Sequence, residues 1–435
     1  MKKQLFSLLL VASVLSACGP AAPQLGKDSV EDVIGAMTLE EKARLVIGTG
    51  MAGTSGDSTV IGTTKKLVPG AAGTTYPIPR LGIPAIVLAD GPAGLRIDPV
   101  REGDSATYYC THFPIGTLLA STWNQDLVEE VGKSIGNEVL EYGADVLLAP
   151  ALNIHRNPLC GRNFEYYSED PLVSGKIAAA YVRGVQSNGV GTSIKHFAAN
   201  NQEYHRMSNS SEADERTLRE IYFPAFETAV KKAQPYTFMC SYNQINGTFA
   251  SENKWLLTDV LRNDWGFEGY VMSDWGAVND RVKGLEAGLD LEMPGSNGTN
   301  DALIMEAVKN GTLKEEVLDQ AVERILNIIY KYADHRAPQE FTMEKDHEEA
   351  RRIAEESMVL LKNADQILPL KTSEKVAFVG GFAKKPRFQG GGSSHINCFK
   401  ITNALEAVPA DAQIIYAEGF PANKDLYDEK PVSYT

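Results

Sequence analysis

The stretch GYVMSDWGA at residues 269–277 decides the fold, because a continuous apolar run ends there in Ser273, Asp274 and Trp275. A strand that is buried on both faces of a parallel sheet reads as such a run. In α/β barrels the C-terminal ends of these strands carry the chemistry. An Asp at the end of a strand is also a common helix N-cap, so this stretch alone leaves both interpretations open.

Four further runs of the same form favour the functional interpretation. They are IVLAD at 86–90, VLLAPALNIHR at 146–156, TSIKHF at 192–197 and TFMCSYN at 237–243. Each is a short apolar run that ends in charged or hydrogen-bonding residues, and stretches of helical periodicity separate them. Because a barrel brings the ends of its strands to one site, we predict an α/β fold with a TIM-like (β/α) barrel.

The pattern divides the chain into two domains. The alternating segments at 38–333 predict the barrel, the polar, Pro338-containing stretch at 334–346 predicts a linker, and 347–435 predicts the start of an α/β/α sandwich. This second part offers a helix at 347–363 and about two strands, too little to cover both faces of a parallel sheet. We therefore expect the second domain to be incomplete.

Two other segments have plain local interpretations. Residues 212–233 carry acids early and lysines late, which predicts a helix that Pro224 bends. Residues 48–73 are rich in Gly, Ser and Thr, which predicts a long surface loop near a rim of the barrel.

The first residues, MKKQLFSLLLVASVLSAC, predict a bacterial secretion signal that ends in a lipobox before Cys18. On this interpretation residues 1–17 are removed, Cys18 carries lipid, and 18–37 form a tether. The expected location is the bacterial envelope, lipid-anchored to the outer membrane and facing the periplasm or the cell surface. An ordinary cleaved signal peptide is the alternative, because the small residues before Cys18 also suit that processing.

The formal net charge of −14 argues against nucleic acid and anionic lipid as partners and leaves a neutral substrate. The lipid on Cys18 is the only membrane attachment that we expect, and the oligomeric state is not determined by the sequence. An oxidising compartment would permit a disulfide, and a bond between Cys110 and Cys160 is one candidate. Cys240 is most simply a small buried apolar residue.

Six long motifs in order give the chain a resemblance to glycoside hydrolase family three, and within it to bacterial β-glucosidases. They are LADGPAGLR (88–96), NIHRNPLCGRNFEYYSEDP (153–171), IKHFAANNQEYHR (194–206), MCSYNQINGTFASEN (239–253), VMSDWGAV (271–278) and GLDLEMP (288–294). SMVLLKNADQILPL (357–370) and GGGSSH (390–395) also look like the start of the family's second domain.

The resemblance implies a retaining, exo-acting β-glucosidase that removes terminal β-D-glucosyl residues from oligosaccharides or aryl glucosides. Asp274 takes the place of the nucleophile that forms a covalent glycosyl-enzyme. Trp275 would give an apolar wall for one sugar face. The positions that match the family's sugar-binding residues are Asp90, Arg96, Arg162, Lys195, His196, Arg206 and Tyr242. No metal and no cofactor are expected.

One departure from the family concerns the general acid/base. In β-glucosidases of this family it is a Glu of the second domain, in a loop well after the GGGSSH turn, and no glutamate after Gly392 lies in a matching motif. A catalytically dead carbohydrate-binding remnant is therefore the alternative to an enzyme. A β-xylosidase of the same family is a further alternative, although Trp275 after the nucleophile favours a glucosidase.

Other interpretations of single residues also stay open. Lys195 and His196 could be a structural pair bonded to loop carbonyls. Arg156 and Glu165 could form a buried ion pair or contact the substrate. A metal site made of His196, Glu203 and His205 is disfavoured, because their spacing fits no usual ligand set.

Overall fold

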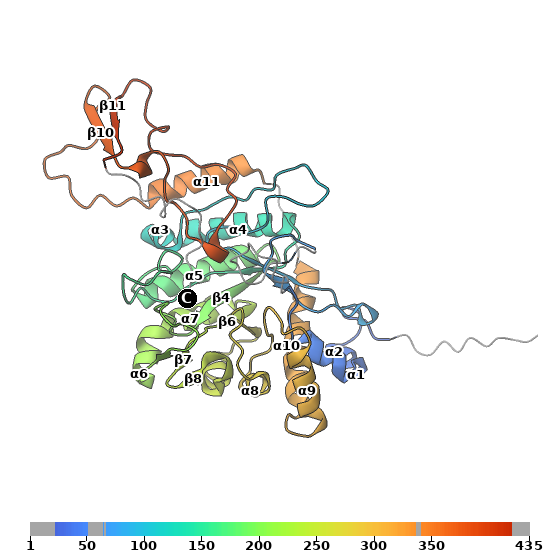
Figure 1. Ribbon diagram of the computed structural model, residues 1–435. Coiled ribbons are helices and arrows are strands. Elements are labelled where there is room, and N and C mark those ends of the chain that lie inside the picture. The colour runs from blue at the N-terminus through green and yellow to red at the C-terminus, as the bar shows by residue number, and fades with distance from the viewer. Residues whose placement is uncertain (1–21, 51–63, 65–66, 336–340, 420–435) are drawn as a thin grey trace, which may run out of the picture.

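The computed structural model describes residues 22–50, 64, 67–335 and 341–419 (Figure 1). The predicted signal at 1–17 and the predicted lipidation site Cys18 lie outside these residues, as does most of the predicted loop at 48–73.

All five strands predicted from the sequence are present. They pair side by side in parallel in chain order, and a short first strand pairs antiparallel with β2. The strands of this sheet are β1 (Gly73–Thr74), β2 (Val87–Asp90), β3 (Val146–Leu148), β4 (Gly191–Phe197), β6 (Thr237–Cys240) and β9 (Tyr270–Ser273). The curled parallel sheet confirms the predicted TIM-like barrel.

Short backbone bridges close the sheet between its last and first strands. Leu291 pairs with Met272 of β9, Glu292 pairs with Ile47, and Thr49 pairs with β1. The amide of Glu292 donates to the carbonyl of Val46 at 3.0 Å, and the amide of Gly48 donates to the carbonyl of Glu292 at 2.8 Å. The barrel is thus completed by two segments too short to be recognised as strands from periodicity.

Arg281 holds this closing seam together. Its side chain is fully buried, and its guanidinium donates to the carbonyls of Leu289 (3.0 Å), Asp290 (2.9 Å) and Val46 (3.2 Å). Hydrogen bonds from both terminal nitrogens offset the cost of burying this arginine, and their acceptors come from both segments of the seam.

Helices surround the barrel (Figure 1). The α-helices are α1 (Val30–Ala36), α2 (Leu39–Leu45), α3 (Gly116–Ser121), α4 (Gln125–Glu141), α5 (Pro171–Gln186), α6 (Glu215–Thr217), α7 (Pro224–Ala233), α8 (Arg281–Ala287), α9 (Thr299–Lys309), α10 (Glu315–His335) and α11 (Met343–Glu356). Shorter or irregular turns are the 3-10 helices η1 (Pro79–Leu81), η3 (Ala250–Glu252), η5 (Gly381–Ala383) and η6 (Gly392–Ser394), and the π-helices η2 (Leu218–Tyr222) and η4 (Trp255–Asp264). A small sheet of β5 (Ser210–Ser211), β7 (Gln244–Ile245) and β8 (Thr248–Phe249) lies beside them.

Successive strand residues belong to two different hydrophobic clusters. Val87 and Val271 pack in the cluster that contains residues of α4, α5 and α7, whereas Leu88 and Met272 pack in the other cluster. Side chains two residues apart on a strand share a face, so Asp90 follows Leu88 and Asp274 follows Met272 on the same face of the sheet. This alternation sets both carboxylates toward the same space at the strand ends.

The predicted helix at 212–233 is interrupted at Pro224, as expected, because α7 begins at that residue after the π-helix η2. Proline is compatible with the first turn of a helix, where its missing amide proton costs no hydrogen bond.

The predicted helix at 347–363 differs from the observed α11. It begins earlier, where the side chain of Thr342 caps the amide of Lys345, and it ends at Glu356. The following Met358, Leu360 and Leu361 are exposed rather than part of a helix. Because these residues are apolar, the sequence pattern predicts a helix that continues past the observed end at Glu356.

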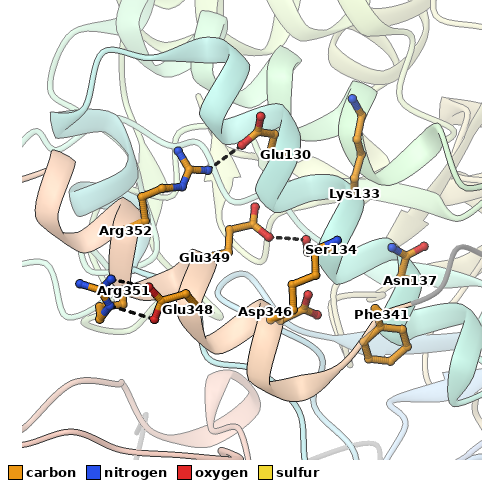
Figure 2. Close-up of a pocket in the computed structure, with 11 residues that line it drawn as sticks. Glu130, Lys133, Ser134, Asn137, Phe341, Asp346, Glu348, Glu349, Arg351 and Arg352 are labelled. Carbon is orange, nitrogen blue, oxygen red and sulfur yellow. Dashed lines mark hydrogen bonds and ion pairs between the residues drawn. The ribbon is translucent and has the colours of Figure 1, made fainter.

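Helix α11 packs against the barrel helix α4 (Figure 2). Ser134 Oγ donates to Glu349 at 2.7 Å, and Arg352 donates to Glu130 at 2.7 Å. A cavity of about 460 Å³ lies among these charged side chains. The second domain therefore meets the barrel through polar contacts, and Ala350 and Ile353 of α11 also belong to the hydrophobic cluster of the barrel.

The rest of the second domain contains β10 (Lys375–Val379) and β11 (Gln413–Ala417), which pair in parallel. The pair lies away from the barrel (Figure 1), and Val379 and Ile415 are exposed by 67% and 59%. Parallel pairing with a helix is the α/β organisation that the sequence predicts for this region.

The predicted tether at 18–37 is wrong for the residues that form α1. Ser29 caps the helix, Val33 is fully buried, and α1 packs on α10. A seven-residue helix gives too short a periodic signal to be recognised from sequence.

The other domain boundaries stay predictions. Among the described residues, no helix has both the length and the apolarity to cross a bilayer.

Candidate active site

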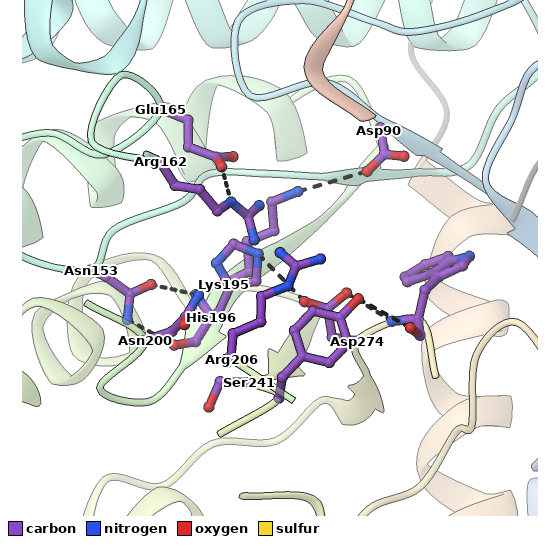
Figure 3. A network of polar contacts seen from close by, with 12 residues as sticks. Asp90, Asn153, Arg162, Glu165, Lys195, His196, Asn200, Arg206, Ser241 and Asp274 are labelled. Atoms are coloured by element: carbon purple, nitrogen blue, oxygen red, sulfur yellow. Dashed lines mark hydrogen bonds and ion pairs between the residues drawn. The ribbon is translucent and has the colours of Figure 1, made fainter. Parts of the chain in front are cut away.

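The candidate site lies where the parallel strands end (Figure 3). Asp90 is the last residue of β2, Lys195 and His196 are near the end of β4, and Asp274 directly follows β9. Tyr242 follows β6 by two residues. Parallel strands present their C-terminal ends at one edge, which explains why residues far apart in sequence meet here.

Asp274 is held by backbone contacts on both sides. Its own amide donates to the carbonyl of Cys240 at 3.2 Å, and its Oδ1 accepts from the amide of Trp275 at 2.7 Å. Its Oδ2 lies 3.6 Å from Nε2 of His196. With only 7% of the residue exposed, the carboxylate is fixed in direction before any ligand arrives.

His196 is neutral in this environment. Burial, and then three neighbouring cationic side chains, hold the pKa of His196 well below its usual range. Burial raises the pKa of the Tyr166 hydroxyl, which keeps its proton, and that hydroxyl lies 3.2 Å from Nδ1 of His196. When Tyr166 donates to Nδ1, the ring proton sits on Nε2 and faces Asp274.

The backbone of His196 is fixed by Asn153. The Asn153 side chain donates to the His196 carbonyl at 2.9 Å and accepts from the His196 amide at 2.8 Å. On the other face of the strand, Phe197 is fully buried against the rings of Phe226 and Phe238. The position of His196 is thus determined by polar contacts on one side and by aromatic packing on the other.

Asp90 joins two of the predicted cationic residues. Its Oδ2 accepts from Arg96 at 2.9 Å, and its Oδ1 lies 3.7 Å from Nζ of Lys195. All three residues are buried. This grouping places two cationic donors and a carboxylate acceptor side by side.

Arg162 and Arg206 come from loops and are each paired with a glutamate. Arg162 donates to Glu165, and Arg206 donates to Glu203 at 3.0 Å. The guanidinium of Arg206 also lies 4.5 Å from the ring centre of Tyr242. These pairs hold long side chains in one orientation, which lowers the entropy cost of contacting a ligand.

Tyr242 and Trp275 lie directly beside the carboxylate. The Tyr242 hydroxyl donates to the carbonyl of Trp275 at 3.0 Å, and burial, followed by the nearby charge of Asp274, holds the pKa of Tyr242 well above its usual range. The indole N–H of Trp275 donates to the carbonyl of Ala72 at 3.0 Å, and 7% of the residue is exposed. The indole is therefore mainly a packing residue with one edge beside the site.

The structure brings together all nine barrel residues predicted for the site, and it corrects one alternative. Arg156 does not pair with Glu165: Arg156 is exposed and donates to the hydroxyl of Tyr222 at 3.1 Å, whereas Glu165 accepts from Arg162. The loop that follows β3 turns Arg156 outward, which a linear pattern cannot show.

Sequence reasoning missed the two residues that orient His196, namely Asn153 and Tyr166. Both belong to the long motif at 153–171, so the motif was the available signal. Its polar and aromatic residues could not be assigned to partners without the fold. Over the ranges that the structure describes, no group of three or more His, Cys, Asp or Glu residues could hold a metal ion.

Comparisons with known proteins agree with this architecture. The model of the glycosyl hydrolase family 3 N terminal domain matches residues 64–328, and that of the glycosyl hydrolase family 3 C-terminal domain matches 358–429. The fold and site define a barrel protein with a carboxylate set among hydrogen-bond donors. The chain belongs to glycosyl hydrolase family 3.

Similar proteins include thermostable beta-glucosidase B of Acetivibrio thermocellus, 47% identical over 412 residues, which are 93% of this chain and 52% of that protein. An exo-alpha-(1->6)-L-arabinopyranosidase of Bifidobacterium longum is 45% identical over 389 residues, 86% of this chain and 48% of that one. The solved structure of beta-glucosidase 3B from Thermotoga neapolitana in complex with alpha-D-glucose has a TM-score of 0.81 and 49% identity, with 87% of this chain and 53% of that chain covered. The chain spans about half the length of these relatives.

Proposed function

We propose that this chain carries the nucleophile and the sugar-binding residues of a retaining, exo-acting β-glucosidase. The observation that supports it most is the setting of Asp274, whose carboxylate accepts from the amide of Trp275 at 2.7 Å and lies 3.6 Å from Nε2 of His196. These contacts fix the direction of a carboxylate of which only 7% of the residue is exposed, and an attack on an anomeric carbon requires a carboxylate so placed.

The surrounding residues fit the chemistry of a terminal monosaccharide. A pyranose offers hydroxyl groups in several directions, and each can both donate and accept a hydrogen bond. Asp90 supplies acceptors, whereas Arg96, Lys195 and Arg206 supply donors from fixed positions. Charge-assisted hydrogen bonds of this kind are short and directional, so they select the arrangement of the hydroxyls.

For the general acid/base we propose no described residue. The family resemblance assigns that role to a glutamate of the second domain, and the proposed reaction requires a carboxyl about 5 Å from the nucleophile. Retention follows from two displacements at the anomeric carbon, the first by Asp274 and the second by water.

An α-L-arabinopyranosidase is a second candidate, because one of the relatives at 45% identity carries that name. The two sugars share a six-membered ring but differ in the substituent at C5 and in the orientation of a hydroxyl. The residues described above bind hydroxyls in general, so substrate comparison decides between the two.

We also propose that the protein acts at the bacterial envelope, anchored by lipid on Cys18. The lipobox before Cys18 in the sequence supports this location.

A mechanism-based label tests the proposed nucleophile. The dinitrophenolate of a 2,4-dinitrophenyl 2-deoxy-2-fluoro-β-glucoside leaves without the help of an acid. The fluoroglycosyl-enzyme that forms is hydrolysed slowly, so the label stays on the chain. We expect one sugar per chain, located on Asp274 by peptide mass spectrometry, and none on Asp274→Ala. Modification of a different carboxylate would reject the assignment. The rates at which the chain releases dinitrophenolate from the corresponding β-glucoside, β-xyloside, β-galactoside and α-L-arabinopyranoside then rank these sugars as substrates.

A further inference from the structure

A segment of the second domain is attached to the rim of the barrel by backbone pairing. The amide of Cys110 donates to the carbonyl of Asn397 at 3.0 Å, and the amide of Phe399 donates to the carbonyl of Cys110 at 3.1 Å. The Asn397 side chain adds a bond to the carbonyl of Tyr108 at 2.7 Å. These contacts join residues almost three hundred positions apart in the chain.

Side chains reinforce the same junction. The ring of Tyr109 lies 6.3 Å from that of Phe399, and the ring of His112 lies 5.1 Å from that of Phe388. Ile396 is 1% exposed and packs in the hydrophobic cluster of the barrel. Side chains that precede Cys398 and one that follows it therefore hold this segment of the second domain on the barrel.

Cys110 and Cys398 are direct partners in this parallel bridge, and both are free thiols. Partner residues on adjacent strands point to the same face, and their backbones lie about 4.7–4.9 Å apart. That separation is within the range of about 4.4–6.8 Å between Cα atoms that disulfides require. At such a spacing a disulfide can form without backbone movement when both side chains adopt suitable rotamers.

The other described cysteines lack this relationship. Cys160 belongs to a separate small cluster with Ala151 and Tyr166, and Cys240 is fully buried in β6. The candidate bond between Cys110 and Cys160 therefore has no support in the packing.

We propose that Cys110 and Cys398 form a disulfide site that locks the second domain to the rim of the barrel. The co-reactant is a small-molecule or protein disulfide. The Cys398 thiolate attacks one of its sulfurs, which forms a mixed disulfide and releases one thiol. The Cys110 thiolate then attacks the sulfur of Cys398 and releases the second thiol. Two S–H bonds of the chain are lost, their protons go to the two released thiolates, and the co-reactant is reduced.

The surroundings make this reaction slow once the chain is folded. Burial raises the pKa of the Cys398 thiol to about 12 and holds that of the Cys110 thiol well above its usual range, and the carboxyl of Glu138 lies beside Cys110. Because the thiolate is the attacking species, closure during folding is faster than closure afterwards.

Lock closure is tested by refolding. The chain carrying Cys18→Ser, so that this thiol is not counted, is refolded from denaturant with reduced and oxidised glutathione. We expect free thiols, titrated in denaturant, to fall from four to two, and a non-reducing digest to contain the peptide pair joined through residues 110 and 398. Cys160→Ser should still lose two thiols. Cys398→Ser should keep all three of its thiols or hold glutathione on one of them.

Either of two thiol measurements would overturn the proposal. One is a digest in which Cys110 is joined to Cys160 or Cys240. The other is retention of four thiols in a chain whose circular dichroism shows that it has refolded. As a further readout, oxidised chain should unfold several degrees higher than the same chain in dithiothreitol, and Cys398→Ser should show no such difference. An equal melting temperature for oxidised and reduced chain would also count against a lock.

Discussion

Nε2 of His196 lies 3.6 Å from a carboxylate oxygen of Asp274, so a neutral imidazole can direct its only N–H at the proposed nucleophile. This direction depends on the opposite ring nitrogen, which faces the hydroxyl of Tyr166. The relationship links a residue of the 153–171 loop to the reacting group through one histidine ring.

Tyr166→Phe should therefore slow labelling of Asp274 by the fluorosugar about 10-fold, the effect of losing one buried hydrogen bond of about 1.4 kcal/mol. The rate constant of labelling is the measurement, taken together with the melting temperature. Tyr167→Phe, at a neighbouring buried tyrosine of the barrel core, is the matched control. An equal loss of labelling in both variants would show that the effect comes from packing.

The low pKa of His196 also predicts a pH profile. The imidazole is already neutral, so it should not titrate between pH 5.5 and pH 7.5, about one unit either side of an ordinary histidine pKa. We therefore expect the rate constant of labelling to depend on pH in the same way in the unmodified chain and in His196→Gln over this range. A step near pH 6.5 that is lost in this variant would mean that His196 titrates normally.

The leaving group tests where the general acid lies. We expect the 435-residue chain to release dinitrophenolate from an aryl β-glucoside slowly, and to leave cellobiose uncleaved, because the alcohol of cellobiose needs a proton to depart. Azide should accelerate turnover of the aryl substrate, since its attack requires no base. Hydrolysis of cellobiose at an ordinary enzymatic rate would locate the acid within these 435 residues.

Glu138 predicts how stability depends on pH. It is fully buried, its oxygens accept from the amide of Thr111 at 2.9 and 3.1 Å, and burial raises its pKa to about 8. The folded chain keeps a proton that the unfolded chain releases near pH 4.5, so this group makes stability fall as pH rises toward 8.

Glu138→Gln replaces the protonated form and should reduce the fall in melting temperature between pH 5 and about pH 8.5, as measured by calorimetry. Glu141→Gln, at an exposed residue of the same helix, should leave the fall unchanged. If the melting temperature of Glu138→Gln fell with pH as much as that of the unmodified chain, Glu138 would not be protonated in the folded state as predicted.

The lipid anchor makes a prediction about location. Cys18→Ser should release a soluble form or stall an unprocessed precursor, because the lipobox cysteine is the proposed attachment point. Fractionation of cells followed by mass spectrometry of the N-terminus is the measurement. A correctly cleaved Cys18→Ser protein that stays with the membrane would reveal another anchor.

The sequence by itself determined the barrel strands and the residues at their ends. Five apolar runs with polar ends are a local signal, because burial on both faces of a parallel strand leaves no alternation. Asp90, Lys195, His196 and Asp274 could be located in this way because each lies at the end of such a run.

The tertiary structure alone decided which groups pair and how the barrel closes. The seam through Ile47 and Glu292 uses single backbone bridges, and Arg281 stabilises it through carbonyls, neither of which leaves a periodic pattern in the chain. Likewise, Tyr166 reaches His196 and Cys110 reaches Cys398 only after distant segments pack together. Such contacts depend on positions in space, and residue types in order along the chain do not specify them.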